Sequence, residues 1–182
     1  MNRGLLLTMT EPPAHLEEEF NAWYDDEHMA ERLAVPGFRS ARRWVTDAKP
    51  GEGKYLATYE LDSPAALTSA AYLARLNSPT PWSKRSLKNC VVFRRWACEQ
   101  TYPGNADPEP RATAMLFCAG DAPYEKKIDG ALQARRFVDP EGKPRHVTLF
   151  ELAGPAPLPR DAGWEFRLYR AYPYGGPWAH PT

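Results

Sequence analysis

Short apolar runs, separated by turns that contain Pro and Gly, divide the first hundred residues into strands and helices. The segment 4–9 is mainly apolar, as in a buried strand, whereas 13–35 repeats its apolar positions at helical spacing. The predicted elements are, in order, a strand at 4–9, a helix from about Pro13 to the Pro36-Gly37 stop, strands at 38–47 and 55–61, a helix that Ser63-Pro64 begins and Pro79 and Pro81 end, and a strand at 89–100. This β-α-β-β-α-β order predicts a ferredoxin-like motif, an antiparallel sheet with both helices on one face.

The second half of the chain repeats the strand segments of the first. Residues 41–45 (ARRWV) return as 134–138 (ARRFV), Tyr55–Leu61 returns as His146–Leu152, 93–96 returns as 166–169, and 112–119 is the counterpart of the opening strand. The connections between these later strands are short or rich in Pro, so we expect no helices there. We therefore predict an α+β fold of two ferredoxin-like repeats, the second with its helices reduced or lost, packed as an intrachain pseudo-dimeric α/β barrel. Repeat one is expected at 1–103, a linker at 104–111 and the degenerate repeat two at 112–182.

Without helices, the outer face of the second sheet needs another explanation. One face of its last strand has a mixed composition, with Glu165, Arg167, Tyr169 and Ala171. Three arrangements stay open for the outer face: it is solvated, it is a homodimer surface, or the aromatic tail at 172–178 covers it.

The first helix carries the richest chemistry of the chain. At about 100° per residue, its core stripe consists of Leu16, Phe20, Trp23 and Ala34. Glu27 falls in the middle of this stripe and His28 at its edge. A buried carboxylate must be paired, hydrogen-bonded or protonated, so Glu27 and His28 become the leading site candidates.

Structural roles are the alternative interpretation of the same residues. Glu27 can reach water at a frayed helix end, and His28 can be a core histidine that donates to a carbonyl group. Asp25 and Asp26 face away from the stripe, and we expect them to be solvated.

The residues Trp23-Tyr24, His28, Pro36-Gly37-Phe38 and Arg43-Trp44 resemble the EthD-like members of the dimeric α/β-barrel superfamily. The resemblance covers residues 3–103 and implies the fold more specifically than the activity. The superfamily includes polyketide cyclases, cofactor-free monooxygenases, lyases and some haem-binding proteins.

The candidate chemistry is proton transfer on a small planar molecule in a pocket between the helices and the sheet of repeat one. The catalytic candidates are His28 as general base or acid, Glu27 or Asp25 to orient it, and Tyr24 to hydrogen-bond a phenol or enolate oxygen. The substrate-binding candidates are Phe20, Trp23 and Trp44, which would stack on the substrate, and Arg43 and Arg95, which would hold a carboxylate or enolate. For the two arginines, a salt bridge or a position at a sheet edge is the alternative.

These residues suit proton transfer, cyclisation or cofactor-free oxidation of an aromatic or polyketide-like ligand, with no cofactor. Haem held by His28 is the weaker alternative. A non-catalytic binding or assembly protein of the same fold is the alternative function.

Composition narrows the remaining classes. The 182 residues are 43% apolar and 25% charged, as in an ordinary globular protein, and the formal net charge is zero, which argues against a nucleic-acid partner. No apolar run is long enough to span a bilayer, and no signal peptide is recognisable. Three widely spaced cysteines predict reduced thiols in a cytoplasmic protein, and the four histidines show no metal-ligand spacing.

Overall fold

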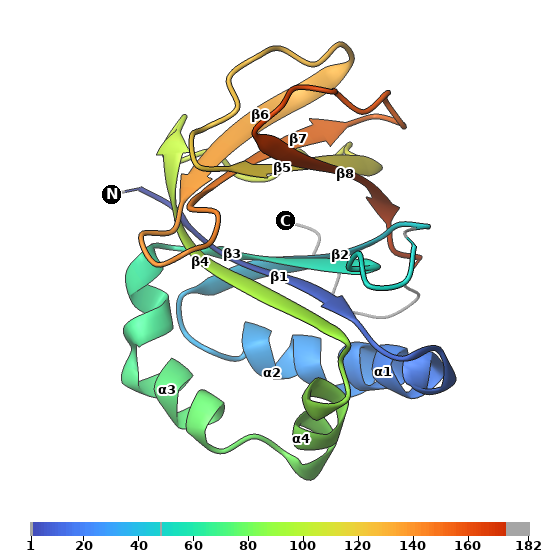
Figure 1. The fold of residues 1–182 in the computed structure, drawn as a ribbon. Coiled ribbons are helices and arrows are strands. Elements are labelled where there is room, and N and C mark those ends of the chain that lie inside the picture. Colours follow the sequence, from blue (N-terminus) through green and yellow to red (C-terminus); the bar gives the residue numbers. More distant parts are fainter. Residues whose placement is uncertain (1, 48, 174–182) are drawn as a thin grey trace.

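The computed structural model describes residues 2–47 and 49–173, in which eight antiparallel strands form one closed barrel (Figure 1). The strands are β1 (Gly4–Glu11), β2 (Phe38–Val45), β3 (Tyr55–Leu61), β4 (Val92–Tyr102), β5 (Ala114–Gly120), β6 (Ala131–Val138), β7 (His146–Leu152) and β8 (Trp164–Ala171). The predicted mixed α+β class is confirmed.

In the described residues, the helices lie on one side of the barrel, next to strands β1 to β4 (Figure 1). The helical elements are a 3-10 turn at Ala14–Leu16, α1 (Glu17–Trp23), a π-helical turn at Tyr24–His28, α2 (Met29–Leu33), a second 3-10 turn at Pro64–Thr68, α3 (Ala70–Asn77) and α4 (Pro81–Lys88). The elements from Ala14 to Leu33 follow one another without a break, so they form one helix with a widened turn in its middle. Gly37, with a φ of 93°, turns the chain from this helix into β2, where a Cβ atom would lie 2.9 Å from that of Ala66.

The two halves of the barrel have the same strand order. Around the barrel the order is β4-β1-β3-β2 and then β8-β5-β7-β6, so each half places its fourth strand beside its first and its third beside its second. Two seams join the halves. At one seam β2 pairs with β8 through only two residue pairs, Trp44 with Ala171 and Val45 with Arg170, and at the other β4 pairs with β6.

The barrel interior is a hydrophobic core to which all eight strands contribute. Its largest buried side chains are Trp44, Trp96, Phe117, Phe137 and Tyr169. Its members alternate along each strand with residues that face outward, as the pleat requires. The interior is therefore filled by side chains.

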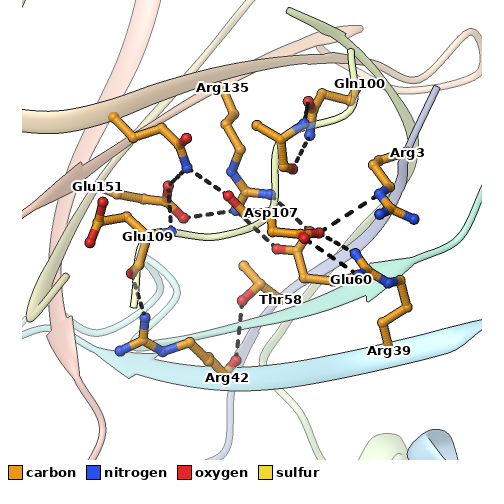
Figure 2. A network of polar contacts seen from close by, with 12 residues as sticks. Arg3, Arg39, Arg42, Thr58, Glu60, Gln100, Asp107, Glu109, Arg135 and Glu151 are labelled. Carbon is orange, nitrogen blue, oxygen red and sulfur yellow. Dashed lines mark hydrogen bonds and ion pairs between the residues drawn. The ribbon is translucent and has the colours of Figure 1, made fainter. Parts of the chain in front are cut away.

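An ionic network lies inside one end of the barrel (Figure 2). The guanidinium of Arg135, on β6, donates to both carboxylate oxygens of Glu60 at 2.8 and 2.9 Å and to Glu151 at 2.8 Å. All three side chains are buried, so this is a paired set of charges taken out of water. The connection between β4 and β5 closes this end, where Asp107 binds Arg39 and the backbone N–H of Glu109 donates to Glu151.

Part of the outer face of the second half is covered by its own connections. Tyr124, from the β5–β6 connection, is buried and packs against Phe150, Trp164 and Phe166. Ala156, from the β7–β8 connection, packs on the same cluster. The rest of the face stays accessible, because Leu168 is only half-buried and Arg170 is exposed.

The mixed face of β8 points into the barrel, since Tyr169 belongs to the interior core. The homodimer stays a prediction. The alternative in which the aromatic tail at 172–178 covers this face lies mostly outside the described residues, because residues 174–178 are not described.

The second helical region differs most from the sequence expectation. Ser63-Pro64 begins only a 3-10 turn, and α3 begins after Ser69, whose side chain caps it. The sequence expectation contains no helix at α4, because a proline after a helical segment usually marks its end. Pro81 is instead the first residue of α4, after the capping residue Thr80, a position where the missing N–H of proline costs no hydrogen bond.

Candidate functional site

The π-helical turn at Tyr24–His28 places the candidate residues. A π turn holds more residues than an α turn, so side chains after it are rotated from the positions that a regular wheel assigns. Phe20, Trp23, Tyr24 and His28 all become buried against the sheet, whereas Ala34, predicted to be in the core, is exposed. Such turns occur often at functional sites.

His28 lies inside an aromatic layer between the helix and the sheet. Its ring centroid is 4.3 Å from that of Trp23, 5.1 Å from Tyr24 and 6.4 Å from Tyr59 on β3. Phe20 extends the same layer, with its ring 5.1 Å from Tyr24. The structure therefore brings together four of the predicted site residues, and it adds Tyr59, which faces the helix because it alternates with the inward-facing Glu60.

The buried hydroxyl of Tyr59 interacts with the side chain of Tyr24. The Nδ1 atom of His28, a residue only 6% exposed, is buried with no hydrogen-bond partner in the described structure. Such a group costs about 1–3 kcal/mol, so native proteins usually pair it. The alternative interpretation, in which His28 donates a hydrogen bond to a carbonyl group, therefore does not hold for Nδ1.

Burial sets the charge state of His28. Desolvation, together with the positive charges of Arg32 and Arg43, lowers the pKa of His28 well below its ordinary value. The imidazole is therefore neutral near pH 7. It can act there as a proton acceptor or a hydrogen-bond partner.

Arg43 lies beside this layer with its guanidinium already engaged. It donates to Asp25 at 2.8 Å and to Asn21 at 2.6 Å, and the rings of Tyr24 and Tyr172 lie 4.3 and 4.0 Å from it. Its side chain is 1% exposed. The salt-bridge interpretation of Arg43 thus describes this structure.

Asp25 was expected to be solvated, and that expectation was wrong. It faces Arg43, and its burial raises the pKa of its carboxyl group against the opposing effect of the guanidinium. Asp26 is exposed, as predicted. The widened turn moves Asp25 inward, and a wheel of regular pitch gives no signal of that shift.

Glu27 holds two helices together and lies apart from the imidazole. Its carboxylate accepts hydrogen bonds from Thr80 at 2.6 Å and Ser83 at 3.3 Å, at the start of α4. Ser83 also accepts a hydrogen bond from the indole of Trp23 at 3.1 Å. Glu27 is only partly buried, so the prediction of a carboxylate in the middle of the buried face was wrong.

Two further candidates do not join the cluster. Trp44 faces the barrel interior, where its indole donates to Thr58, because it alternates with the outward-facing Arg43. Arg95 is exposed on β4 and donates to the hydroxyl of Tyr72 at 3.3 Å. Neither residue contributes to an enclosure around His28.

The space near His28 is filled by side chains. Phe20, Trp23 and Met29 are each at most 2% exposed, and the cavity beside α1 and α4 measures only about 10 Å³. A larger cavity of about 600 Å³ lies elsewhere, at the seam between β2 and β8. A ligand reaches His28 only if the helical layer opens.

The described residues offer no candidate metal site. They contain no group of three or more His, Cys, Asp or Glu side chains arranged to hold a metal ion. Among their helices, none combines the length and apolar character needed to cross a membrane. Cys90, Cys98 and Cys118 are free thiols, as expected.

No protein-family model matches the chain. No curated protein matches it either.

Proposed function

We propose that this protein binds a small aromatic or polyketide-like molecule against His28 and acts on it by proton transfer, cyclisation or cofactor-free oxidation. The observation that carries the proposal is the buried, unpaired Nδ1 of His28 in an aromatic layer that also contains the buried hydroxyl of Tyr59. A polar atom of a ligand beside Nδ1 would satisfy it.

The environment of His28 keeps its imidazole neutral, with an unprotonated nitrogen that can accept a hydrogen bond. The burial that lowers its pKa also makes it a weak base, so proton transfer requires the negative charge that develops on the ligand to stabilise the imidazolium. Aromatic walls exclude water and stack on a planar ligand. Tyr24, whose hydroxyl lies 3.3 Å from that of Thr8, is the second group that would hold a ligand oxygen. Arg43 would not bind the ligand directly, because Asp25 and Asn21 hold its guanidinium. Its positive charge would lie near the ligand.

The helix α3 offers a route into the layer. Tyr72 is its buried residue, stacked on Phe38 at 5.8 Å, whereas Leu73 and Leu76 are 40% and 47% exposed. Phe38 in turn contacts Tyr59, whose ring is next to His28. Displacement of α3 would open this chain of rings, because few buried contacts hold the helix in place.

The finer description of the fold belongs to the same proposal, namely two ferredoxin-like repeats of EthD-like type joined in one chain. The shared strand order supports it. Equivalent hydrogen bonds at the two seams support it too: the indole of Trp96 donates to the carbonyl of Pro144, and the hydroxyl of Tyr169 donates to that of Gly53. Trp96 and Tyr169 occupy matching positions of the repeated sequence.

A non-catalytic binding or assembly role is the second candidate. The observation that favours it is the engaged state of Arg43, whose two terminal nitrogens bind Asp25 and Asn21. Under this proposal the aromatic layer is a core that stabilises the helical side of the barrel.

A thermal-shift screen separates the two candidates. Wild type, His28→Gln and the matched control His15→Gln, an exposed position on the same helix, are screened against planar phenols, quinones and polyketide-like acids. The enzyme proposal expects a ligand that stabilises wild type and His15→Gln but not a folded His28→Gln variant, and turnover that follows the same pattern. Equal stabilisation of all three proteins by a ligand would favour the structural role. The structural role would also be favoured if no ligand bound and His28→Gln were simply less stable than wild type.

A further inference from the structure

The cavity of about 600 Å³ lies where β2 and β8 separate, away from His28. The pairing of these strands ends at Val45 and Arg170, so the rest of β8, back to Trp164, runs beside β5 with its other edge unpaired. The cavity is lined by the end of β2, the β2–β3 hairpin, the β7–β8 connection and β8 itself. Its volume is in the range of small-molecule sites.

The opposite seam, between β4 and β6, is closed, in contrast to the β2–β8 seam. There the carboxylate of Asp139 accepts a hydrogen bond from the backbone N–H of Ala97 at 2.7 Å, and Pro144 in the same connection accepts one from Trp96. The β6–β7 connection thus fills the space beside β4. The two seams differ, although the halves share one strand order.

The unpaired edge of β8 presents backbone polar groups to the cavity. Ala171 donates its N–H to Thr113 before β5, whereas Tyr172 donates to Arg43 on β2, so odd-numbered residues of β8 bond toward β5 and even-numbered residues toward β2. Phe166 and Leu168 therefore direct their N–H and C=O groups to the side where no strand follows. Backbone groups in this position hydrogen-bond to water or to a ligand.

Side chains around this edge form an apolar surface that ends in a positive charge. Phe166, Leu168 and Arg170 share the outer face of β8 by alternation, and Leu158 lies across the cavity. Arg170 is exposed and makes no ion pair with the described carboxylates, whereas the neighbouring Arg167 is held by Glu52 and Glu165.

We propose that the β2–β8 seam is a binding site for a small amphipathic carboxylate. The apolar body lies on Phe166, Leu168 and Leu158, and the carboxylate accepts hydrogen bonds from the Arg170 guanidinium and the N–H of Leu168. The carboxylate is placed at Arg170, because this guanidinium makes no ion pair with the described carboxylates and the N–H of Leu168 lies on the same edge. The exposed carboxylate of Asp47 also lines the cavity, and it repels an anion placed beside it. The site is separate from the His28 layer and does not depend on the function proposed for it.

The test uses the full chain labelled with ¹⁵N and titrated with octanoate, with octanol as the uncharged ligand of equal length. We expect octanoate to shift the amide signals of Phe166 and Leu168, and Arg170→Glu to weaken it about tenfold, which corresponds to loss of one favourable charge contact. Lys127→Glu, the same charge change at an exposed residue outside the cavity, should leave the affinity within about twofold.

Each other outcome overturns the proposal. Equal binding of octanoate and octanol would refute the role of the carboxylate, and equal weakening by Lys127→Glu would show non-specific attraction. Shifts confined to the helical layer, or no binding at millimolar octanoate, would show that the seam is not this site. His28→Gln should leave octanoate binding unchanged, so a failure of the function proposed for His28 is distinguishable from a failure here.

Discussion

Replacing Arg135 with Met should destabilise the protein strongly. The substitution keeps most of the side-chain volume but removes the guanidinium that binds Glu60 and Glu151. Both carboxylates are buried, at 5% and 0% exposed, so they would stay in the barrel without a counter-charge or would have to take up protons. Arg135 lies in the second half of the barrel and Glu60 in the first, so the change acts on the joint between the halves.

The expected loss is about 3–5 kcal/mol in the free energy of unfolding, the usual cost of removing one partner from a buried ion pair. For a chain of this size, 1 kcal/mol shifts the melting temperature by about 2–4 °C, so the midpoint should fall by about 6–20 °C. Urea unfolding followed by circular dichroism measures the loss, and the slope of the transition shows whether both halves unfold together.

The matched control is Arg136→Met, the next residue of β6. Arg136 points outward and pairs with the exposed Glu125 at 3.3 Å, an interaction worth at most about 1 kcal/mol. If Arg135→Met loses no more stability than Arg136→Met, the reasoning about the buried charges fails. The combination of Arg135→Met with Glu60→Gln and Glu151→Gln should recover much of the loss, since no uncompensated charge then remains.

Three further predictions concern the helical side. Tyr59→Phe should lower the free energy of unfolding by no more than about 1.5 kcal/mol, the usual net contribution of one hydrogen bond, since the buried hydroxyl of Tyr59 interacts with Tyr24; a loss above about 2 kcal/mol in urea unfolding would contradict this. Because the pKa of His28 is lowered on folding, only the unfolded chain gains its proton just below pH 6.5, so stability should fall by up to about 1.4 kcal/mol per pH unit there, and His28→Gln should flatten this slope. Asp25→Asn should cost about 1–3 kcal/mol by weakening its contact with buried Arg43, whereas Asp26→Asn should change little, which paired urea titrations would check.

The strands were predictable because their patterns are local. Tyr55–Leu61 and His146–Leu152 have the bounds expected from the sequence, and the repeated segments 41–45 and 134–138 lie within β2 and β6. The proposal of Arg43 and Trp44 for one pocket was wrong, because adjacent residues of a strand point to opposite faces.

The candidate site was less predictable, because it depends on one irregular turn. A wheel of constant pitch placed Glu27 inside and Asp25 outside, and the π turn at Tyr24–His28 changed both positions. The face of β8 that forms the interior was also misjudged, since Glu165 and Arg167 resemble a solvated face while Tyr169 is core. Charged residues that pair at the end of a barrel cannot be distinguished by composition from charged residues in water.

The connection between β4 and β5 has a consequence for how the two halves assemble. Because a short segment joins them, their association is intramolecular, with an effective concentration on the order of millimolar for linkers of this kind. Dilution therefore cannot separate them, whereas a dimer of equal halves would dissociate as its concentration fell. A seam of only two residue pairs, as between β2 and β8, is tolerable under these conditions. Joining the halves in one chain thus allows one edge of the barrel to stay open without loss of the assembly.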